Sequence, residues 1–469
     1  MKLTKKVKGI ILALCIISFG LGVFLPKFVT SSTNEEQKKF DKIYQILTTK
    51  WYYSDDVKNL DDTLMEQAIT GMTSLEKDPH TNYFDLDQAK AFSEELDGST
   101  VGLGFGYYEN DEGNLVLTNV YLNSAADQAG LQRGDIITGV DSYACKDGIK
   151  QVVKYIQSKA NQTILVKFIR DGKDKMIKAK PQSFDATVIC EAYKDYGVIT
   201  LTSFSSMTGK DFNKAMKRLS SQGIRKVIVD LRNNTGGYLN AAVDVASSLL
   251  PKGKVVVQEK DKDGKITKRK TNDAYQQVKM DKIILLQNDK TASASEALIG
   301  ALKQQLPKKV TTVGTTTYGK GTEQEQVSFK DGTSMKYTVG KWLTPNGSNI
   351  NEKGFKPDVS VEDEKANEVS YESFKKKDVI APDTTATNAE ALQVFLAYLG
   401  YDVDRTDMYF SPTSSEALKQ FQSDNGIVAS GSCNYTTWKK LLKKVGMALQ
   451  DQQRTTNPQY RKAVEMIES

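Results

Sequence analysis

The chain has 469 residues, of which 39% are hydrophobic and 26% are charged, a composition typical of a folded globular protein. One compact core rarely exceeds about 250–300 residues, so this length predicts two to four domains. The formal net charge of +6 is small for the length, which argues against nucleic acid as the main partner. The four cysteines lie far apart without a CxxC motif. The sequence therefore predicts no disulfide framework, no metal site and no cofactor.

The N-terminus predicts a membrane anchor. An uncharged apolar run at residues 9–26 follows four lysines, and its eighteen residues are just enough to cross a bilayer. Lysines before the run and a polar chain after it place the bulk of the chain outside the cytoplasm. A cleaved signal peptide is the alternative, but no small-x-small cleavage site follows. The bulky Leu14 argues against a lipid on Cys15. We expect residues 1–29 to be an uncleaved, single-pass anchor in the cell membrane.

Residues 30–97 are expected to be mainly helical. The apolar residues that recur there at helical spacing are Phe40, Ile43, Ile46, Leu47, Leu64, Ile69, Met72 and Leu75. A turn that starts at Asp78 and Pro79 interrupts this pattern. It contains the only histidine of the chain, His80, without a serine or acidic motif beside it. We expect His80 to be a turn residue rather than a catalytic base.

Residues 98–181 change to short β-like runs. The run begins with Gly102-Leu-Gly-Phe105, and a second motif, Ser-Ala-Ala-Asp-Gln-Ala-Gly-Leu-Gln-Arg-Gly-Asp, fills residues 124–135. A glycine loop before a strand offers backbone N–H groups to a carboxylate, and the open strand edge beside it can accept an extended peptide. A small β-domain that only packs against its neighbours is the alternative interpretation.

Residues 182–362 alternate between strands and helices. The strand patterns lie at 197–204, 226–231 and 283–286, and the helical patterns at 211–221, 239–250 and 297–306. The strand at 226–231 is apolar on both faces, as a buried parallel sheet requires. This order predicts an α/β core whose functional site lies at the carboxyl ends of its strands.

A serine-bearing turn, Thr291-Ala-Ser-Ala-Ser-Glu296, joins the last of these strands to the last helix. A turn of small residues at this place can expose a nucleophile beside the N–H groups that start the helix. Because the single histidine lies far upstream, a lysine is the leading candidate for the base. Ser293 and Ser295 are the two serines that this turn offers.

Lys320 is the predicted base. A neutral lysine amine can take a serine proton if burial or nearby positive charge lowers its pKa from about 10.4. Lys320 lies between two glycines, so its backbone can form a tight turn and approach the site. Gln324 carries a neutral amide that can orient the amine. Oxyanion stabilisation needs two donors, and Gly236-Gly237 together with the N–H of Ala294 are placed to supply them.

Residues 363–387 are polar and are expected to form a linker. Residues 388–445 predict a small three-helix unit, and residues 446–469 a helical tail. The small unit is similar to the peptidoglycan-binding-like module in its segments Leu399-Gly-Tyr401, Ala417–Gln422, Asn425-Gly-Ile427, Gly431 and Thr437-Trp438. A helical packing domain without a ligand is the alternative, because these residues are core signals.

The two motifs of residues 98–181 resemble a PDZ domain of the bacterial protease type. This resemblance implies that a peptide carboxylate is held at Gly102–Phe105 by the backbone N–H groups of Leu103, Gly104 and Phe105.

Six segments in order resemble the C-terminal processing peptidases, also called tail-specific proteases. They are residues 78–84, 230–237, 293–296, 318–324, 342–347 and 354–358. The resemblance implies a serine endopeptidase with Ser293 as nucleophile, Lys320 as base and Gln324 as third member. It also implies that the PDZ domain binds protein C-termini and gates the site, with Arg170 as a candidate relay.

The resemblance further implies dimerisation through terminal segments, for which the helices at 30–75 and 446–468 are the candidates. The expected protein is a multidomain α/β and α+β chain, anchored in the membrane and acting on protein C-termini outside the cytoplasm. The alternative is an inactive scaffold that binds peptides and the cell wall. An intact set of Ser293, Lys320, Gln324 and Gly236-Gly237 favours the enzyme, because a scaffold has no physical need for all of them.

Overall fold

The computed structural model describes residues 35–452 and 456–469. The chain forms two compact units, Met1–Asp85 and Leu86–Ser469. Within the described ranges, no helix is both long and apolar enough to cross a membrane. The anchor predicted at residues 9–26, and Cys15 within it, lie outside the described residues.

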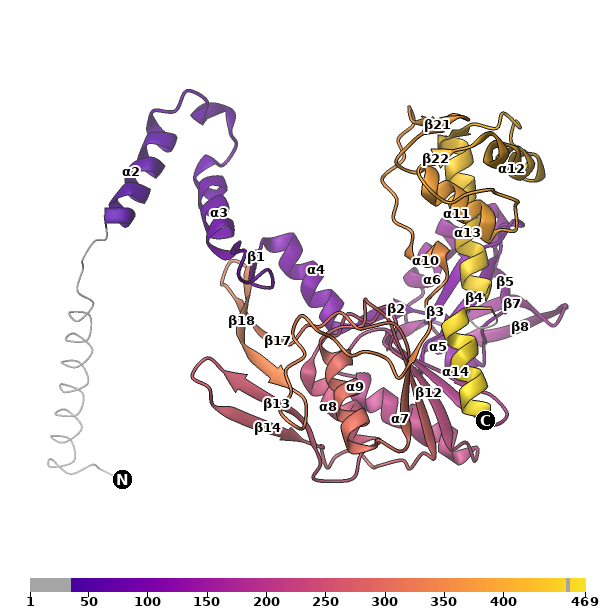
Figure 1. The fold of residues 1–469 in the computed structure, drawn as a ribbon, viewed down its shortest axis with the longest axis horizontal. Coiled ribbons are helices and arrows are strands. Elements are labelled where there is room, and N and C mark those ends of the chain that lie inside the picture. Colours follow the sequence, from indigo (N-terminus) through magenta and orange to yellow (C-terminus); the bar gives the residue numbers. More distant parts are fainter. Residues whose placement is uncertain (1–34, 453–455) are drawn as a thin grey trace. The chain divides into compact units, whose positions relative to one another are not determined.

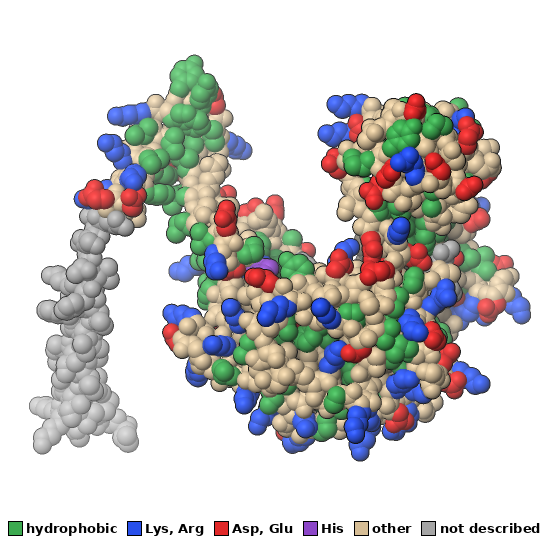
Figure 2. All heavy atoms as spheres, viewed as in Figure 1, with side chains coloured by type: hydrophobic (Ala, Val, Ile, Leu, Met, Phe, Trp, Pro, Cys, Tyr) green, Lys and Arg blue, Asp and Glu red, His purple; other side chains and the backbone are tan. Residues whose placement is uncertain are grey.

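The described part of the first unit is a helical hairpin followed by a short strand. Its elements are α2 (Glu35–Thr49), the 3-10 turn η2 (Ser54–Asp56), α3 (Leu60–Thr73) and β1 (Asn82–Phe84). The Tyr44 hydroxyl on α2 donates to Asp61 on α3 at 2.8 Å. The predicted helices are confirmed, yet several of their apolar side chains are exposed, and Figure 2 shows apolar atoms gathered over this hairpin. His80 lies in a turn, as expected.

The second unit begins with α4 (Leu86–Asp97) and leads into the PDZ region. Two strands, β2 (Ser99–Gly102) and β9 (Gln182–Asp185), pair antiparallel where the chain enters and leaves this region. Between them lies a sheet of order β3-β4-β5-β7-β8, with β6 beside β5. The elements of this region, in chain order, are β3 (Phe105–Glu109), β4 (Leu115–Val120), α5 (Ala125–Ala129), β5 (Ile136–Val140), β6 (Tyr143–Ala144), the 3-10 turn η3 (Cys145–Asp147), α6 (Ile149–Ser158), β7 (Ile164–Arg170) and β8 (Lys173–Ala179). The predicted β-rich domain is present with its own apolar core.

A six-stranded sheet of order β10-β11-β12-β15-β16-β19 forms the centre of the second unit. Its strands are β10 (Val188–Ala192), β11 (Gly197–Leu201), β12 (Lys226–Asp230), β15 (Lys282–Gln287), β16 (Val310–Gly314) and β19 (Val359–Ser360). All neighbouring pairs are parallel except β10 with β11. The predicted α/β core is therefore confirmed.

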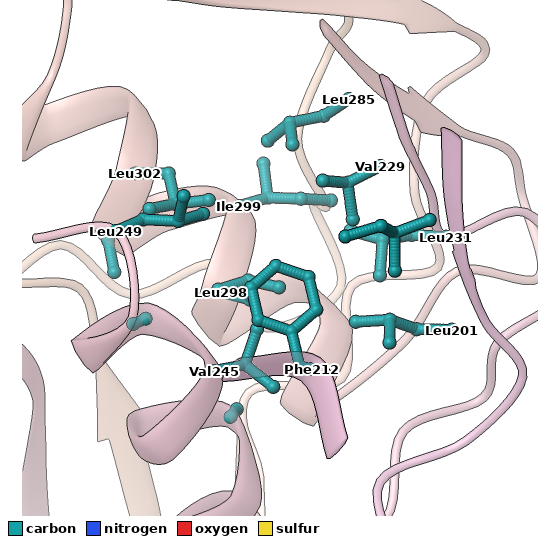
Figure 3. Packing of buried hydrophobic residues seen from close by; sticks show 14 of the residues in the cluster. Leu201, Phe212, Val229, Leu231, Val245, Leu249, Leu285, Leu298, Ile299 and Leu302 are labelled. Carbon is teal, nitrogen blue, oxygen red and sulfur yellow. The ribbon is translucent and has the colours of Figure 1, made fainter. Parts of the chain in front are cut away.

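Helices cover both faces of this sheet. One face packs against α7 (Thr208–Ser221), α8 (Leu239–Ser247) and α9 (Ala294–Gln305) through a large apolar cluster. Figure 3 shows Leu298 and Ile299 within this cluster, together with Val229 and Leu285 of the strands. Alternating strand residues point to opposite faces, so Ile228, Ile284 and Leu286 pack on the other face with α14 (Pro458–Glu468).

A second, antiparallel sheet lies beside the core. The hairpin of β13 (Val255–Asp261) and β14 (Ile266–Lys270) pairs with β18 (Ser334–Leu343), which also pairs with β17 (Thr322–Ser328). The βαβ pattern did not predict these strands. β14 and β17 are short of apolar residues and have no buried residue, so their hydrophobic periodicity is weak.

The C-terminal module starts earlier than predicted. The segment expected to be a linker contains α10 (Lys365–Glu368), β20 (Val379–Ile380) and β21 (Thr384–Thr385). Phe374 within it stacks on Trp438 with ring centroids 5.1 Å apart, and Phe374 and Ile380 are buried in the module's core. Two buried apolar side chains thus hold this otherwise polar segment against the C-terminal module. The remaining elements are α11 (Ala389–Tyr398), β22 (Tyr409–Phe410), α12 (Pro412–Asp424), β23 (Cys433–Asn434) and α13 (Tyr435–Gln452).

The C-terminal tail is part of the core rather than an appendage. Its helix α14 (Pro458–Glu468) buries Tyr460, Ala463 and Ile467 against the central sheet, as its position beside β12 in Figure 1 illustrates. The buried Arg232 at the end of β12 donates to Asn457 at 2.7 Å. The apolar face of α14 is therefore buried against the central sheet of the same chain.

Candidate active site

Two loops meet at one edge of the central sheet. β12 ends at Asp230 and leads into the loop that contains Gly236 and Gly237, and β15 ends at Gln287 and leads into the serine turn. The two strands are parallel neighbours, so their carboxyl ends lie at the same edge. The N–H of Ala292 donates to the carbonyl of Asn234 at 3.0 Å and joins the two loops.

Ser293 occupies a strained turn at the start of α9. Its φ of 55° and ψ of −115° are unusual for a residue with a side chain. Such a turn directs a serine side chain away from the strand and toward the edge of the sheet. Ser293 remains partly accessible, whereas Ala294 is fully buried as the first residue of the helix. The N–H of a first helical residue has no partner within the helix.

Ser295 is held in a different environment. It is fully buried, and its hydroxyl donates to the carbonyl of Asn234 at 3.1 Å. A serine whose hydroxyl is buried and bonded cannot meet a substrate. Of the two serines in the turn, only Ser293 is accessible.

The two glycines of the β12 loop differ in their roles. The N–H of Gly236 donates to Oδ1 of Asn234 at 2.9 Å, so the expectation that it stabilises an oxyanion does not fit this structure. Instead, Gly236 permits close approach, because an added Cβ would lie 2.8 Å from the Cβ of Ser293. Gly237 has a φ of 134°, and an added Cβ would lie 2.3 Å from the carbonyl oxygen of Phe204. Both positions exclude side chains.

The Lys320 turn is fixed through its backbone. The carbonyl of Lys320 accepts a hydrogen bond from the indole of Trp342 at 2.9 Å, and Trp342 is almost fully buried. Gly319 has a φ of 88°, and an added Cβ would lie 2.8 Å from two backbone nitrogens. The flanking glycine thus allows the tight turn that the sequence predicted.

Glu296 joins the serine turn to the lysine turn, a role that the sequence did not predict. Its fully buried carboxylate accepts hydrogen bonds from four groups. They are the N–H of Ser293 (2.8 Å), the N–H of Lys320 (2.9 Å), the N–H of Gly319 (2.7 Å) and the hydroxyl of Thr317 (2.6 Å). Burial raises the pKa of this carboxyl, and the hydrogen bonds oppose that shift. The spacing Ser293-x-x-Glu296 is a capping box, which was the available signal.

Gln324 lies on β17, four residues beyond Lys320. A bulge interrupts the β17–β18 register between Glu323 and Gln324. The amide nitrogen of Gln324 donates to the hydroxyls of Thr322 at 2.9 Å and Thr338 at 3.1 Å. These bonds fix the side chain on the second sheet, on the strand that follows the lysine turn.

The neighbouring Glu323 is electrostatically perturbed. Burial, together with the nearby carboxylate of Glu259, raises its pKa to about 7, while Arg269 opposes the shift. A carboxyl group that titrates near neutral pH thus lies between Lys320 and Gln324 in the chain. Within the described residues, no cluster of three or more His, Cys, Asp or Glu side chains could hold a metal ion.

The glycine loop of the PDZ region has its carbonyl groups turned inward. The carbonyl of Leu103 accepts from the N–H of Ala126 at 2.7 Å, and that of Gly104 accepts from the N–H of Tyr121 at 3.0 Å. In a trans peptide, the carbonyl and the following N–H point in opposite directions. The N–H of Gly104 therefore points away from α5, and that of Phe105 points away from Tyr121, which follows β4. β3, which continues the loop, is an edge strand.

Two polar contacts join the PDZ region to α7. Asn123 donates to Asp211 at 2.8 Å, and Arg218 forms an ion pair with Asp127 at 2.8 Å.

Arg170, by contrast, lies within the PDZ region. It forms a two-bond ion pair with the buried Asp135 at 2.6 Å and donates to the carbonyl of Gly130 at 2.8 Å. These contacts hold Arg170 within the PDZ region, whereas the expected relay would connect that region to the protease core.

Three segments of the chain match known domain families. Residues 195–361 match Peptidase family S41, residues 116–170 match the PDZ domain, and residues 385–441 match the putative peptidoglycan binding domain. Together they describe a serine peptidase that carries a PDZ domain and a peptidoglycan-binding domain.

Relatives cover nearly the whole chain. It is 34% identical over 451 residues to a probable CtpA-like serine protease of Staphylococcus epidermidis, a match that covers 93% of this chain and 88% of the relative. A protein described in the same words from Staphylococcus aureus is 33% identical over 435 residues, covering 92% and 86% of the two chains. The chain therefore belongs to peptidase family S41, and the resemblance to the C-terminal processing peptidases is confirmed.

Solved structures are also similar. One is the photosystem II D1 C-terminal processing protease, with 25% sequence identity, a TM-score of 0.39, and coverage of 70% of this chain and 94% of that one. Another is a putative S41 protease from Bacteroides fragilis, with 18% identity, a TM-score of 0.40, and coverage of 68% and 90%.

Proposed function

We propose that this S41 serine protease is a membrane-anchored endopeptidase that acts outside the cytoplasm, with Ser293 as nucleophile and Lys320 as base. The observation that carries the proposal is the Glu296 carboxylate, which accepts from the backbone of both Ser293 and Lys320. A single buried group thus fixes the turns of both residues. Ser293 is partly accessible, whereas the alternative, Ser295, is buried and bonded.

The reaction has two halves. In the first, the neutral amine of Lys320 takes the hydroxyl proton of Ser293 as its Oγ attacks the peptide carbonyl carbon. The resulting oxyanion is stabilised by the N–H groups of Gly237 and Ala294. The C–N bond then breaks, the leaving amine takes the proton from Lys320, and an acyl-enzyme remains. In the second half, water attacks this ester with Lys320 again as base, the ester C–O bond to Oγ breaks, and the proton on Lys320 passes to Ser293 as the acid product leaves. Gln324 completes the site by helping to orient the amine.

The PDZ domain is proposed to recognise protein C-termini. A substrate carboxylate would bind at the outward N–H groups of Gly104 and Phe105, with that of Leu103 completing the loop. Upstream residues would add to the free edge of β3. The inward-turned carbonyls of Leu103 and Gly104 support this proposal.

Two further partners belong to the proposal. The apolar run at residues 9–26 anchors the chain in the cell membrane, and the C-terminal module binds peptidoglycan. Exposed apolar side chains on α2 and α3, among them Ile43 and Met72, support homodimerisation through the N-terminal hairpin. Light scattering of the full-length chain and of an Ile43→Lys/Met72→Lys variant tests the dimer. If the hairpin forms the dimer contact, the variant should have the smaller mass.

Cleavage of an unstructured protein by the full-length chain in detergent tests the catalytic proposal. Ser293→Ala and Lys320→Ala should each lower kcat by at least about 10³-fold and leave the unfolding temperature nearly unchanged. A residual Lys320→Ala rate that rises steeply at high pH agrees with the loss of a base. Equal rates for wild type and Ser293→Ala would contradict the catalytic proposal, and rates no higher than without the protein would favour the inactive scaffold.

A further inference from the structure

A two-stranded ribbon connects the PDZ domain to the protease core. The chain enters through β2, whose last residue, Gly102, is the first residue of the carboxylate-binding loop, and leaves through β9, which ends at Asp185. Ser99 at the start of β2 pairs with Asp185, and Gly98 precedes it with a φ of 65°. The loop and Asp185 therefore lie at opposite ends of one two-stranded ribbon.

Asp185 is held by a buried cluster of hydroxyl groups. One of its oxygens accepts from the hydroxyl and, at 3.1 Å, from the N–H of Thr187, and the other accepts from the hydroxyl of Ser205. Thr187, Ser205 and Thr208 are each almost completely buried. The hydroxyl of Thr208 lies 2.8 Å from that of Thr187 and accepts from the N–H of Ser205 at 2.8 Å. Few alternative partners exist in such a site, so the cluster specifies one geometry.

The residue before Ser205 holds the oxyanion loop. The N–H of Phe204 donates to the carbonyl of Gly236 at 2.9 Å, and its carbonyl accepts from the N–H of Tyr238 at 2.8 Å. These two bonds lie on either side of Gly237, whose N–H is the proposed oxyanion donor. Phe204 itself is almost fully buried. The orientation of the Gly237 peptide therefore depends on where the backbone at 204–205 lies.

The second connection between the PDZ domain and the core reaches the same place. Thr208, the first residue of α7, belongs to the Asp185 cluster, and Asp211, three residues later, accepts from Asn123 of the PDZ domain. Asn123 itself lies next to Ser124, whose hydroxyl donates to the carbonyl of Gly104 in the carboxylate-binding loop at 3.1 Å. Both routes from that loop end beside Ser205.

We propose that Asp185 is a positioning residue that couples peptide binding at the PDZ domain to the orientation of the Gly237 N–H at the catalytic serine. The coupling passes from the β2–β9 ribbon through the Asp185–Ser205 hydrogen bond to Phe204. It rests on the proposed function, since it needs both carboxylate binding by the PDZ domain and oxyanion stabilisation by Gly237. A peptide bound at Gly102–Phe105 favours the ribbon position in which the hole is formed.

The test uses two fluorogenic peptides that differ only at the C-terminus, one a free carboxylate and the other an amide. Wild-type full-length chain should cleave the free-carboxylate peptide with a higher kcat. Asp185→Asn replaces an acceptor oxygen by a donor, and Ser205→Ala removes the hydroxyl between Asp185 and Phe204. Each should lower kcat for the free-carboxylate peptide about 10-fold, toward the rate for the amide. The dissociation constant of that peptide, measured by anisotropy on a Ser293→Ala background, should not change.

The matched control is Asp404→Asn in the C-terminal module, where a carboxylate likewise accepts from two serine hydroxyls, those of Ser411 and Ser414. It should keep the wild-type ratio of the two rates. The double variant Asp185→Asn/Ser205→Ala should be no slower than either single variant, because the two substitutions remove the same connection, the Asp185–Ser205 hydrogen bond.

The outcomes separate the two proposals. If wild type prefers the free carboxylate and Asp185→Asn and Ser205→Ala keep that preference, the coupling role of Asp185 is wrong while the proposed function stands. A parallel loss of peptide affinity would also overturn it, because Asp185 would then only shape the PDZ domain. Equal rates for both peptides in wild type would refute both carboxylate recognition and coupling, and absence of cleavage would refute the protease itself. If Asp185→Asn lowers the unfolding temperature, the ratio of the two cleavage rates in Ser205→Ala alone decides whether the coupling exists.

Discussion

The hydroxyl of Ser295 donates to the carbonyl oxygen of Asn234 at 3.1 Å, so the second serine of the turn supports the oxyanion loop. Its removal should affect stability more than chemistry. We expect Ser295→Ala to lower the free energy of unfolding by about 1 kcal/mol, because the buried carbonyl of Asn234 loses one of its two hydrogen bonds and keeps the one from the N–H of Ala292. Proteolytic activity should stay within about 10-fold of wild type, whereas Ser293→Ala should lose at least about 10³-fold.

Thermal unfolding and cleavage rates of the two alanine variants check this prediction. A Ser295→Ala variant that is as inactive as Ser293→Ala, with an unchanged unfolding temperature, would contradict the assignment of the nucleophile.

Glu296 should be required for both the fold and the rate. Glu296→Gln turns one acceptor oxygen into an NH₂ group, which faces N–H donors at 2.7–2.9 Å. The turns of Ser293 and Lys320 then lose their common partner. We expect kcat to fall about 10²-fold, as for a lost positioning group, with a smaller change in KM and a lower unfolding temperature. Glu325→Gln, an exposed residue on β17, is the control and should match wild type in each measurement.

The sequence predicted the site better than its surroundings. The strand that ends at Gln287 and the helix that begins at Ala294 carry strong apolar periodicity, and their junction located Ser293. Glycines on both sides of Lys320 predicted its turn. Glu296 was missed because the sequence shows a glutamate at the start of a helix, while its partners at Gly319 and Lys320 depend on tertiary folding.

Other differences share a physical cause, since single apolar residues can dock segments that are polar on average. Phe374 fixes a segment expected to be a linker, and Tyr460 with Ile467 turns the C-terminal tail into a cover for the sheet. The donor role expected of Gly236 failed because the side chain of Asn234 captures its N–H. Such local competition for a hydrogen bond cannot be read from sequence spacing.

Glu323 should make stability depend on pH. Its pKa is raised from 4.5 to about 7 by burial and by Glu259, with Arg269 opposing and Glu325 adding to the shift. The folded state therefore binds the proton more tightly than the unfolded state. The stabilisation is complete below 4.5 and is lost as the pH rises through about 7.

Glu323→Gln imitates the protonated carboxyl at every pH. The variant and wild type should unfold at similar temperatures at about pH 4.5, and the variant should be the more stable above about pH 7. Unfolding temperatures across this range measure the difference. Glu325→Gln should weaken the slope only slightly, because Glu325 makes the smallest of the contributions that raise the pKa of Glu323. A Glu323→Gln slope equal to that of wild type would contradict the assignment.

Arg170 should act first on the PDZ domain itself. It holds the carboxylate of Asp135, which is only 1% exposed, with two bonds of 2.6 Å. Removing one partner of a buried ion pair leaves the other charge without compensation, which costs about 3–5 kcal/mol for a fully buried pair. Because the Arg170 side chain is 22% exposed, we expect the lower end of that range for Arg170→Ala. Unfolding followed by a probe in the PDZ domain measures the loss.

A relay role for Arg170 and a structural role make different demands on Asp135. If the ion pair only stabilises the domain, Asp135→Asn/Arg170→Ala should be no less stable than Arg170→Ala alone, since no buried charge remains. Both variants should then share one peptide affinity and one cleavage rate. If Arg170 is a relay, both Arg170→Ala and the double variant should cleave the free-carboxylate peptide more slowly than wild type. Because the described contacts of Arg170 lie within the PDZ domain, we expect the structural outcome, and Asp185 rather than Arg170 should control the rate.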